Sequence, residues 1–217
     1  MKSLHRPNLF GWSTFDCSRN IDFNSVVWTT RNANGDRANV VIDPLPLSEH
    51  DWAHLQTLGG VTTIVVTNSD HVRDAKVLRE RTGATLYGPA AERHTFPISC
   101  DAWLSNGERL MDGLAVYELS GSKTQGELAL LIDGETLVTG DLIRSHAGGR
   151  LDILPAAKLK DPSEALRSVR QLLSIGTLQA VLPGDGWPVF RDAPLLLGEL
   201  ISRLELDAGF CAPKTQP

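Results

Sequence analysis

The chain has few of the features that mark membrane or extracellular proteins. Its 217 residues contain no apolar run near the ~18 residues that a membrane-spanning helix needs. Its three cysteines, Cys17, Cys100 and Cys211, are odd in number, lie far apart and form no CxxC pair. The spacing excludes a disulfide framework and suits a reducing compartment.

Positive charge is also scarce, with 21 Lys and Arg against 26 Asp and Glu and a net charge of -5. This balance provides neither the basic surface that binds nucleic acid nor a polybasic patch for anionic lipids. The stretch from Met1 to Phe15 lacks the apolar run of a signal peptide. We therefore expect a cytoplasmic protein that binds a small molecule and has no nucleic acid or membrane partner. The sequence leaves open whether it forms a homo-oligomer.

The chain does contain a repeated pattern of short strands and helices. In the first half, Asn34-Gly35 predicts a hairpin turn between strands at 26–30 and 38–43. Ser48 predicts the start of a helix that runs to Leu58. Further elements are expected as strands at 62–67, 84–88, 115–119, 128–132, 136–139 and 177–182, and as helices at 74–82, from 162 to about 175, and at 193–206.

Each half ends in an apolar strand that carries an acid at its tip. The first strand leads into Asp70-His71, and the second leads into Asp185. Functional groups of layered folds gather at such strand ends. We interpret the pattern as an α/β (α+β) fold, in which two mixed β-sheets pack face to face with helices outside as a four-layer αββα sandwich. No linker divides residues 1–217, so a single domain is expected.

Four turns, in order, resemble the motifs of the metallo-β-lactamase superfamily over nearly the whole chain. The segment 66–71 occupies the position of the family's HxHxDH motif, and 121–126 occupies the position of its Gly-His-Thr-Pro-Gly-like turn. Its Thr-Gly-Asp turn matches Thr139-Gly140-Asp141 outright, and its Leu-Pro-Gly-His-Gly-like turn matches 182–186. One such turn alone would be a weak match, but four in this order and context support the fold.

The resemblance implies two adjacent metal sites, and the ligands of the first are replaced. That site uses three histidines, whose positions here hold Val66, Asn68 and Lys123. Valine has no donor atom, and a lysine cation repels a metal ion. The resemblance therefore predicts that the first site is lost.

Every position that the resemblance assigns to the second metal site keeps a donor atom. These positions hold Asp70, His71, Asp141 and Asp185. Three carboxylates and one imidazole make Mn, Fe(II) or Mg as suitable as Zn. The same residues taken singly fit helix caps and polar turns, so a protein without any metal stays an alternative.

The positive charge of Lys123 also suggests a role for this residue. Carboxylates that converge without a counter-charge repel one another, and at least one would take up a proton. The ammonium group of Lys123 is therefore predicted to replace the missing first ion as charge partner of Asp141. The alternative is an ordinary solvated lysine.

Cations near these turns are candidates for binding an anionic substrate. They are Arg73, Arg144, Lys158 and Lys160, and a carboxylate or phosphate is the group they would bind. Salt bridges to the neighbouring acids and an ordinary helix entry are the alternatives. His146 follows Asp141 by five residues and is expected near the mouth of the same site.

The leading hypothesis is a metal-dependent hydrolase that retains one metal site. Its substrate would be a small ester, thioester, lactone or phosphoester. Asp70 or Asp185 would orient water or act as general base, with Lys123 as the catalytic cation. The alternative is a metal-free binding protein or a structural protein of the same fold.

Overall fold

A computed structural model describes residues 1–207 and residue 210, so Cys211 lies outside the described residues. Within them, strands in sequential order form a first mixed sheet, and a second mixed sheet packs against it. The first sheet consists of β1 (Lys2–Ser3), β2 (Leu9–Asp16), β3 (Ile21–Trp28), β4 (Val40–Ile42), β5 (Thr63–Val65), β6 (Thr85–Pro89) and β7 (Ala102–Leu104). The second has the order β14 (Ala180–Pro183), β11 (Thr136–Thr139), β10 (Glu127–Ile132), β9 (Leu114–Leu119) and β8 (Arg109–Met111). A separate hairpin pairs β12 (Ile143–Ala147) with β13 (Arg150–Ile153).

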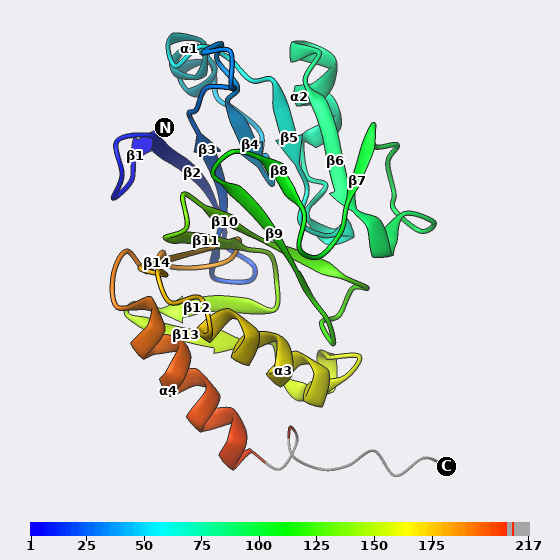
Figure 1. The fold of residues 1–217 in the computed structure, drawn as a ribbon, viewed down its shortest axis with the longest axis vertical. Coiled ribbons are helices and arrows are strands. Elements are labelled where there is room, and N and C mark those ends of the chain that lie inside the picture. The colour runs from blue at the N-terminus through cyan, green and yellow to red at the C-terminus, as the bar shows by residue number, and fades with distance from the viewer. Residues whose placement is uncertain (208–209, 211–217) are drawn as a thin grey trace.

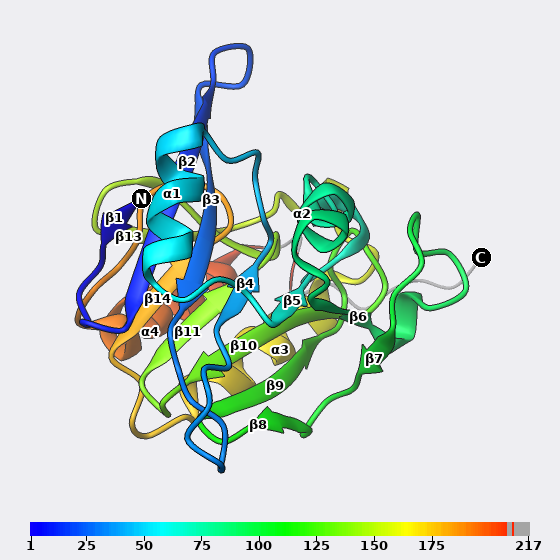
Figure 2. The same cartoon turned by 90° about the horizontal axis from the view of Figure 1, so that it is seen from above.

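Helices cover the outer face of each sheet. The first sheet carries α1 (Glu49–Thr57) and α2 (Ala75–Thr82), and the second carries α3 (Pro162–Leu173) and α4 (Ala193–Leu206). Figure 1 shows these helix pairs at opposite ends of the molecule, with both sheets between them. Figure 2 shows α1 and α2 lying over the first sheet. The predicted four-layer αββα sandwich is confirmed.

The alternation of side chains along each strand decides which layer they join. In β3, Val26 and Trp28 face the second sheet, whereas Val27 faces the outer helices. In β4, Ile42 faces the second sheet and Val41 the helices. Since the strand repeat is two residues, one apolar run supplies both faces of a buried sheet.

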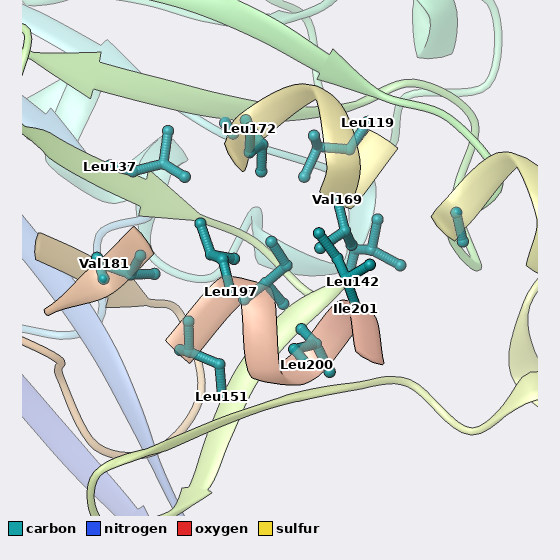
Figure 3. Packing of buried hydrophobic residues seen from close by; sticks show 14 of the residues in the cluster. Leu119, Leu137, Leu142, Leu151, Val169, Leu172, Val181, Leu197, Leu200 and Ile201 are labelled. Carbon is teal, nitrogen blue, oxygen red and sulfur yellow. The ribbon is translucent and has the colours of Figure 1, made fainter. Parts of the chain in front are cut away.

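A third core fills the space between the second sheet and helices α3 and α4. Figure 3 shows Val169 and Leu172 of α3 beside Leu197, Leu200 and Ile201 of α4. These side chains recur at helical spacing, so each helix turns one apolar face to the sheet. Burying one such leucine contributes about 1.5–3 kcal/mol.

Local sequence signals place several elements correctly. The Ser48 hydroxyl accepts a hydrogen bond from the Asp51 amide at 3.1 Å and caps α1, as predicted. The Asn34-Gly35 turn joins β3 to β4, which pair antiparallel as predicted. The β12–β13 hairpin is not anticipated by the sequence, since its register shifts between Arg144 and Ala147 and breaks the alternation. Among the described residues no helix has the length and apolarity to span a membrane.

Candidate metal site

Two parallel strand pairs, one in each sheet, bring the candidate site together. In the first sheet β4 and β5 run parallel, and in the second β11 and β14 do so. Asp43 follows β4, and His71 follows β5 at the end of a short turn. Asp141 follows β11, and Asp185 follows β14. Because the carboxyl ends of parallel strands lie at the same edge, four polar side chains from distant segments converge.

The buried pair of Asp43 and His71 orients the imidazole. The Nδ1 atom of His71 lies 2.8 Å from Asp43 Oδ2. Thr67 holds this carboxylate by donating its amide to Oδ1 and its hydroxyl to Oδ2, both at 2.7 Å. A carboxylate on one ring nitrogen fixes the tautomer and leaves the other nitrogen available to a metal ion. Sequence reasoning missed Asp43, whose signal is an acid directly after an apolar strand and before Pro44.

The other ring nitrogen faces two buried carboxylates. His71 Nε2 lies 3.6 Å from Asp141 Oδ1 and 3.9 Å from Asp185 Oδ1. Among the described residues, these three form the group whose donor atoms all lie within 4.8 Å of one another. Asp185 Oδ1 is buried and receives no hydrogen bond from any described residue. An unsatisfied carboxylate oxygen facing an imidazole nitrogen fits one divalent ion.

Two glycines allow the strand ends to approach so closely. A Cβ atom on Gly184 would lie 2.5 Å from Cε1 of His71, and one on Gly140 would lie 2.6 Å from Nδ2 of Asn68. Both contacts are shorter than packed atoms tolerate. The glycines beside Asp185 and Asp141 are therefore required by packing around the site.

The positions that the family resemblance assigns to a first metal site do not fit an ion. Val66 is fully buried in the core between the first sheet and its helices. Asn68 uses its side-chain oxygen to accept the Asp70 amide at 2.9 Å and so caps the turn that carries His71. Lys123 Nζ lies 2.7 Å from Asp70 Oδ2 and 3.0 Å from Asp141 Oδ2. A protein cation thus contacts Asp141 on the side away from His71.

Asp70 lies outside the group formed by His71, Asp141 and Asp185. Its side chain is 53% exposed at the cleft and pairs with Lys123, whereas those of Asp141 and Asp185 are buried. Three of the four predicted metal-ligand residues therefore share one centre. Asp70 is linked to them only by Lys123, whose ammonium group contacts both Asp70 and Asp141.

Two arginines neutralise the buried acids from the other side. Arg144 Nη2 lies 3.3 Å from Asp141 Oδ1 and 3.2 Å from Asp185 Oδ2. Arg73 Nη2 lies 3.8 Å from Asp185 Oδ1 and 3.4 Å from His71 Nε2. Asp141 and Asp185 therefore each contact at least one cation.

Glu127, which sequence reasoning also missed, supports the turns behind the site. Its fully buried carboxylate accepts the Asp141 amide at 2.7 Å, the Leu142 amide at 2.8 Å and the Ser122 hydroxyl at 2.7 Å. It therefore ties the turn of Asp141 to the loop of Lys123. Burial and the nearby charge of Asp141 raise the pKa of Glu127 to about 7. An acid beginning an otherwise apolar strand is the signal in the sequence.

The charges of the cluster shift its ionisation. Burial and the charge of Arg73 lower the pKa of His71, but Asp43 and Asp141 outweigh them and raise it to about 10. Burial raises the pKa of Asp141, yet hydrogen bonds and the charges of His71 and Lys123 hold it well below its usual range. Burial lowers the pKa of Lys123, and the carboxylates of Asp141 and Asp70 raise it above its ordinary value. Without a metal ion His71 is therefore a cation, and an ion would displace its proton.

A cleft of about 1270 Å³ opens over the cluster. His71, Asp141 and Asp185 line it, as do the predicted substrate-binding cations Arg73, Arg144 and Lys158. The predicted neighbour His146 also lines the cleft, on β12. Lys160 is exposed and lies outside the lining of this cleft.

Comparison with known proteins agrees with this architecture. Residues 1–204 match the family model described as the metallo-beta-lactamase superfamily. A curated relative, the hydroxyacylglutathione hydrolase of Cereibacter sphaeroides, is 34% identical over an alignment of 111 residues that covers 48% of this chain and 40% of the relative. The chain thus matches well under half the length of that enzyme.

Solved structures show the same fold. DIM-1 metallo-beta-lactamase superposes with a TM-score of 0.73 at 19% identity, over 94% of this chain and 96% of its own. TTHA1623, solved in a di-iron-bound form, superposes with a TM-score of 0.59 at 25% identity, over 84% of this chain and 94% of its own. With the family match covering nearly its full length, the chain belongs to the metallo-β-lactamase superfamily.

Proposed function

We propose that the protein is a hydrolase of small anionic substrates that uses one divalent ion held by His71, Asp141 and Asp185. The observation that carries the proposal is the orientation of His71: Asp43 occupies Nδ1, and Nε2 faces two buried carboxylates. A carboxylate behind a metal-binding histidine is a recurrent feature of functional metal sites. The relative named hydroxyacylglutathione hydrolase makes an acyl thioester the first substrate to test.

The bound ion would polarise the carbonyl or phosphoryl group under attack and make water more acidic. The other steps fall to the side chains around it. Asp70 is exposed at the cleft and, held by Lys123, can accept a proton from water. The Lys123 ammonium stabilises negative charge beside Asp141. Lys158, exposed on the cleft wall, is placed to attract the anionic part of a substrate.

One observation favours a second candidate, a binding protein that needs no metal. Asp70, Asp141 and Asp185 each contact Lys123, Arg144 or Arg73, so the charges of the acids are matched by protein cations. Such a cluster can be stable without an ion. It would present a charged cleft to an anionic ligand without catalysis.

Metal analysis and a substrate panel separate the two candidates. The protein is purified without chelators, its metal content is measured, and hydrolysis of S-lactoylglutathione, a lactone and a phosphodiester is assayed with Mn²⁺, Fe²⁺ or Zn²⁺. The hydrolase predicts binding of up to one ion per chain when the metal is supplied, and an activity that Asp141→Asn abolishes while the fold is kept. Asp36→Asn, in the exposed β3–β4 turn, is the matched control and should stay active. No bound ion and no turnover under any supplement would favour the binding protein.

A further inference from the structure

Arg73 is fixed in place more firmly than a substrate-binding arginine needs to be. Its side chain is 9% exposed, and its guanidinium donates to the carbonyl oxygens of Asn24 at 2.5 Å, Asp43 at 3.1 Å and Gly184 at 3.2 Å. These carbonyls belong to three segments, within β3, after β4 and after β14. The backbone of Arg73 has φ of 43°, a conformation that non-glycine residues adopt rarely and at a cost. Several independent contacts therefore hold one orientation of the side chain.

This locked cation lies beside two of the three donor atoms of the candidate metal site. Arg73 Nη2 is 3.4 Å from His71 Nε2 and 3.8 Å from Asp185 Oδ1. A guanidinium keeps its charge at every accessible pH. An ion held by His71 and Asp185 would thus sit close to a positive charge that can neither leave nor be neutralised.

The surrounding acids offer little charge to offset that repulsion. Asp141 and Asp185 already contact Arg144, and Asp141 also contacts Lys123. A divalent ion would add two positive charges to carboxylates whose charge is already matched. Asp43 remains behind the imidazole, where it supports His71 rather than facing the ion.

We infer that Arg73 is an internal competitor of the metal ion, which makes the wild-type site a weak and reversible binder of divalent cations. The inference rests on the proposed site at His71, Asp141 and Asp185. It assigns Arg73 a role different from substrate binding, since its guanidinium is committed to three carbonyls. Weak binding follows from a fixed charge and not from missing ligands.

The test is a metal titration that does not depend on activity. Chelator-stripped wild-type protein and Arg73→Met are titrated with Mn²⁺ and Co²⁺ by calorimetry, and the Co²⁺ absorption spectrum reports the ligands. Arg73→Met should bind at least tenfold more tightly, which corresponds to about 1.4 kcal/mol or more. Arg19→Met removes a cation from the rim of the same cleft and should leave the affinity unchanged. Adding Asp185→Asn to Arg73→Met should remove the gain.

Two further variants keep the inference falsifiable. Arg73→Gln is neutral and retains an amide donor for the carbonyls, so it replaces Arg73→Met if circular dichroism shows that methionine disrupts the fold. Arg73→Lys keeps the charge and should bind no more tightly than wild type. Equal affinity of wild type and both neutral variants would overturn the inference and leave the proposed function standing. Tight binding by a neutral variant, with no binding by the wild type, would support the inference and contradict a metal-dependent wild-type hydrolase. No binding by any variant would overturn both.

Discussion

Replacing Asp43 with asparagine should flatten the pH dependence of stability in the metal-free protein. The reason is the buried contact of 2.8 Å between Asp43 and His71, which together with Asp141 raises the pKa of His71 from 6.5 to about 10. A group whose folded-state pKa is raised stabilises fully below its unfolded pKa and loses that contribution as the pH rises through the folded value. Between about pH 7.5 and pH 9 the unfolded histidine is neutral, whereas the folded one keeps its proton.

The magnitude follows from linkage. One extra proton bound by the folded state lowers the free energy of unfolding by about 1.4 kcal/mol per pH unit, or about 2 kcal/mol over this window. Glu127, with a pKa of about 7, titrates mainly below the window. Burial raises the pKa of Cys100 from 9.0 to about 11, so this thiol adds only a small loss near the top of the window, which wild type and Asp43→Asn share. The change across the window is therefore assigned chiefly to His71.

Urea unfolding in chelating buffer, followed by tryptophan fluorescence, measures the effect. Asp43→Asn is the suitable change, because residue 43 has φ of 49° and asparagine tolerates that conformation. The variant should lose less than half as much stability across the window as wild type. It should also bind metal about 10–100-fold more weakly, since its amide favours the wrong imidazole tautomer. Equal pH slopes for wild type and Asp43→Asn would refute the reasoning, and Asp36→Asn should keep the wild-type slope.

Three further changes test the packing and charges around the site. Gly184→Ala places a methyl group 2.5 Å from His71 and should lower the free energy of unfolding, measured by thermal unfolding, by about 1–3 kcal/mol. The control Gly198→Ala lies on α4, where a Cβ atom meets no neighbour, and should raise the free energy of unfolding by about 0.5–1 kcal/mol. Wild type should lose stability as the pH rises from 4.5 through about 7, because its raised pKa keeps Glu127 protonated in the folded state alone, and Glu127→Gln should abolish this loss. Glu127→Ala leaves buried donors unpaired and should cost about 3 kcal/mol or more in urea unfolding at every pH. Lys123→Met leaves Asp141 with Arg144 but without the cation on its other oxygen, and should cost about 1–3 kcal/mol in the same assay. The surface control Lys76→Met should leave the stability unchanged.

Most of the secondary structure was predictable because its signals are local. Ser48 caps the start of α1 and Gly83 caps the end of α2, so the sequence marks these helix ends. The strand at 128–132 is apolar enough to be recognised from its own residues. The prediction of α4 at 193–206 matches the structure. The β12–β13 hairpin escaped prediction because a bulge interrupts its pattern. Strand β2 escaped because only its first half is buried.

The residues of the candidate site also differ in whether the sequence alone could identify them. The chain order of the four turns, with Asp141 and Asp185 at strand ends, was legible in the sequence and sufficed to suggest the family. Asp43 and Glu127 were not found, because each acts on a partner far away in the chain: Asp43 on His71, and Glu127 on the turn of Asp141. Sequence spacing carries no information on such contacts.

The sequence by itself determined the layers of the fold, since alternation fixes burial, and it predicted the loss of a first metal site, since valine has no donor atom. Only the tertiary structure decided which charges meet. It separates Asp70 from His71, although the two are adjacent in the chain, because neighbouring residues of a tight turn point in different directions. It also directs Arg73 at the imidazole through three carbonyls from distant segments. Long-range pairing of strand ends sets those distances, and these distances govern how strongly the site can hold an ion.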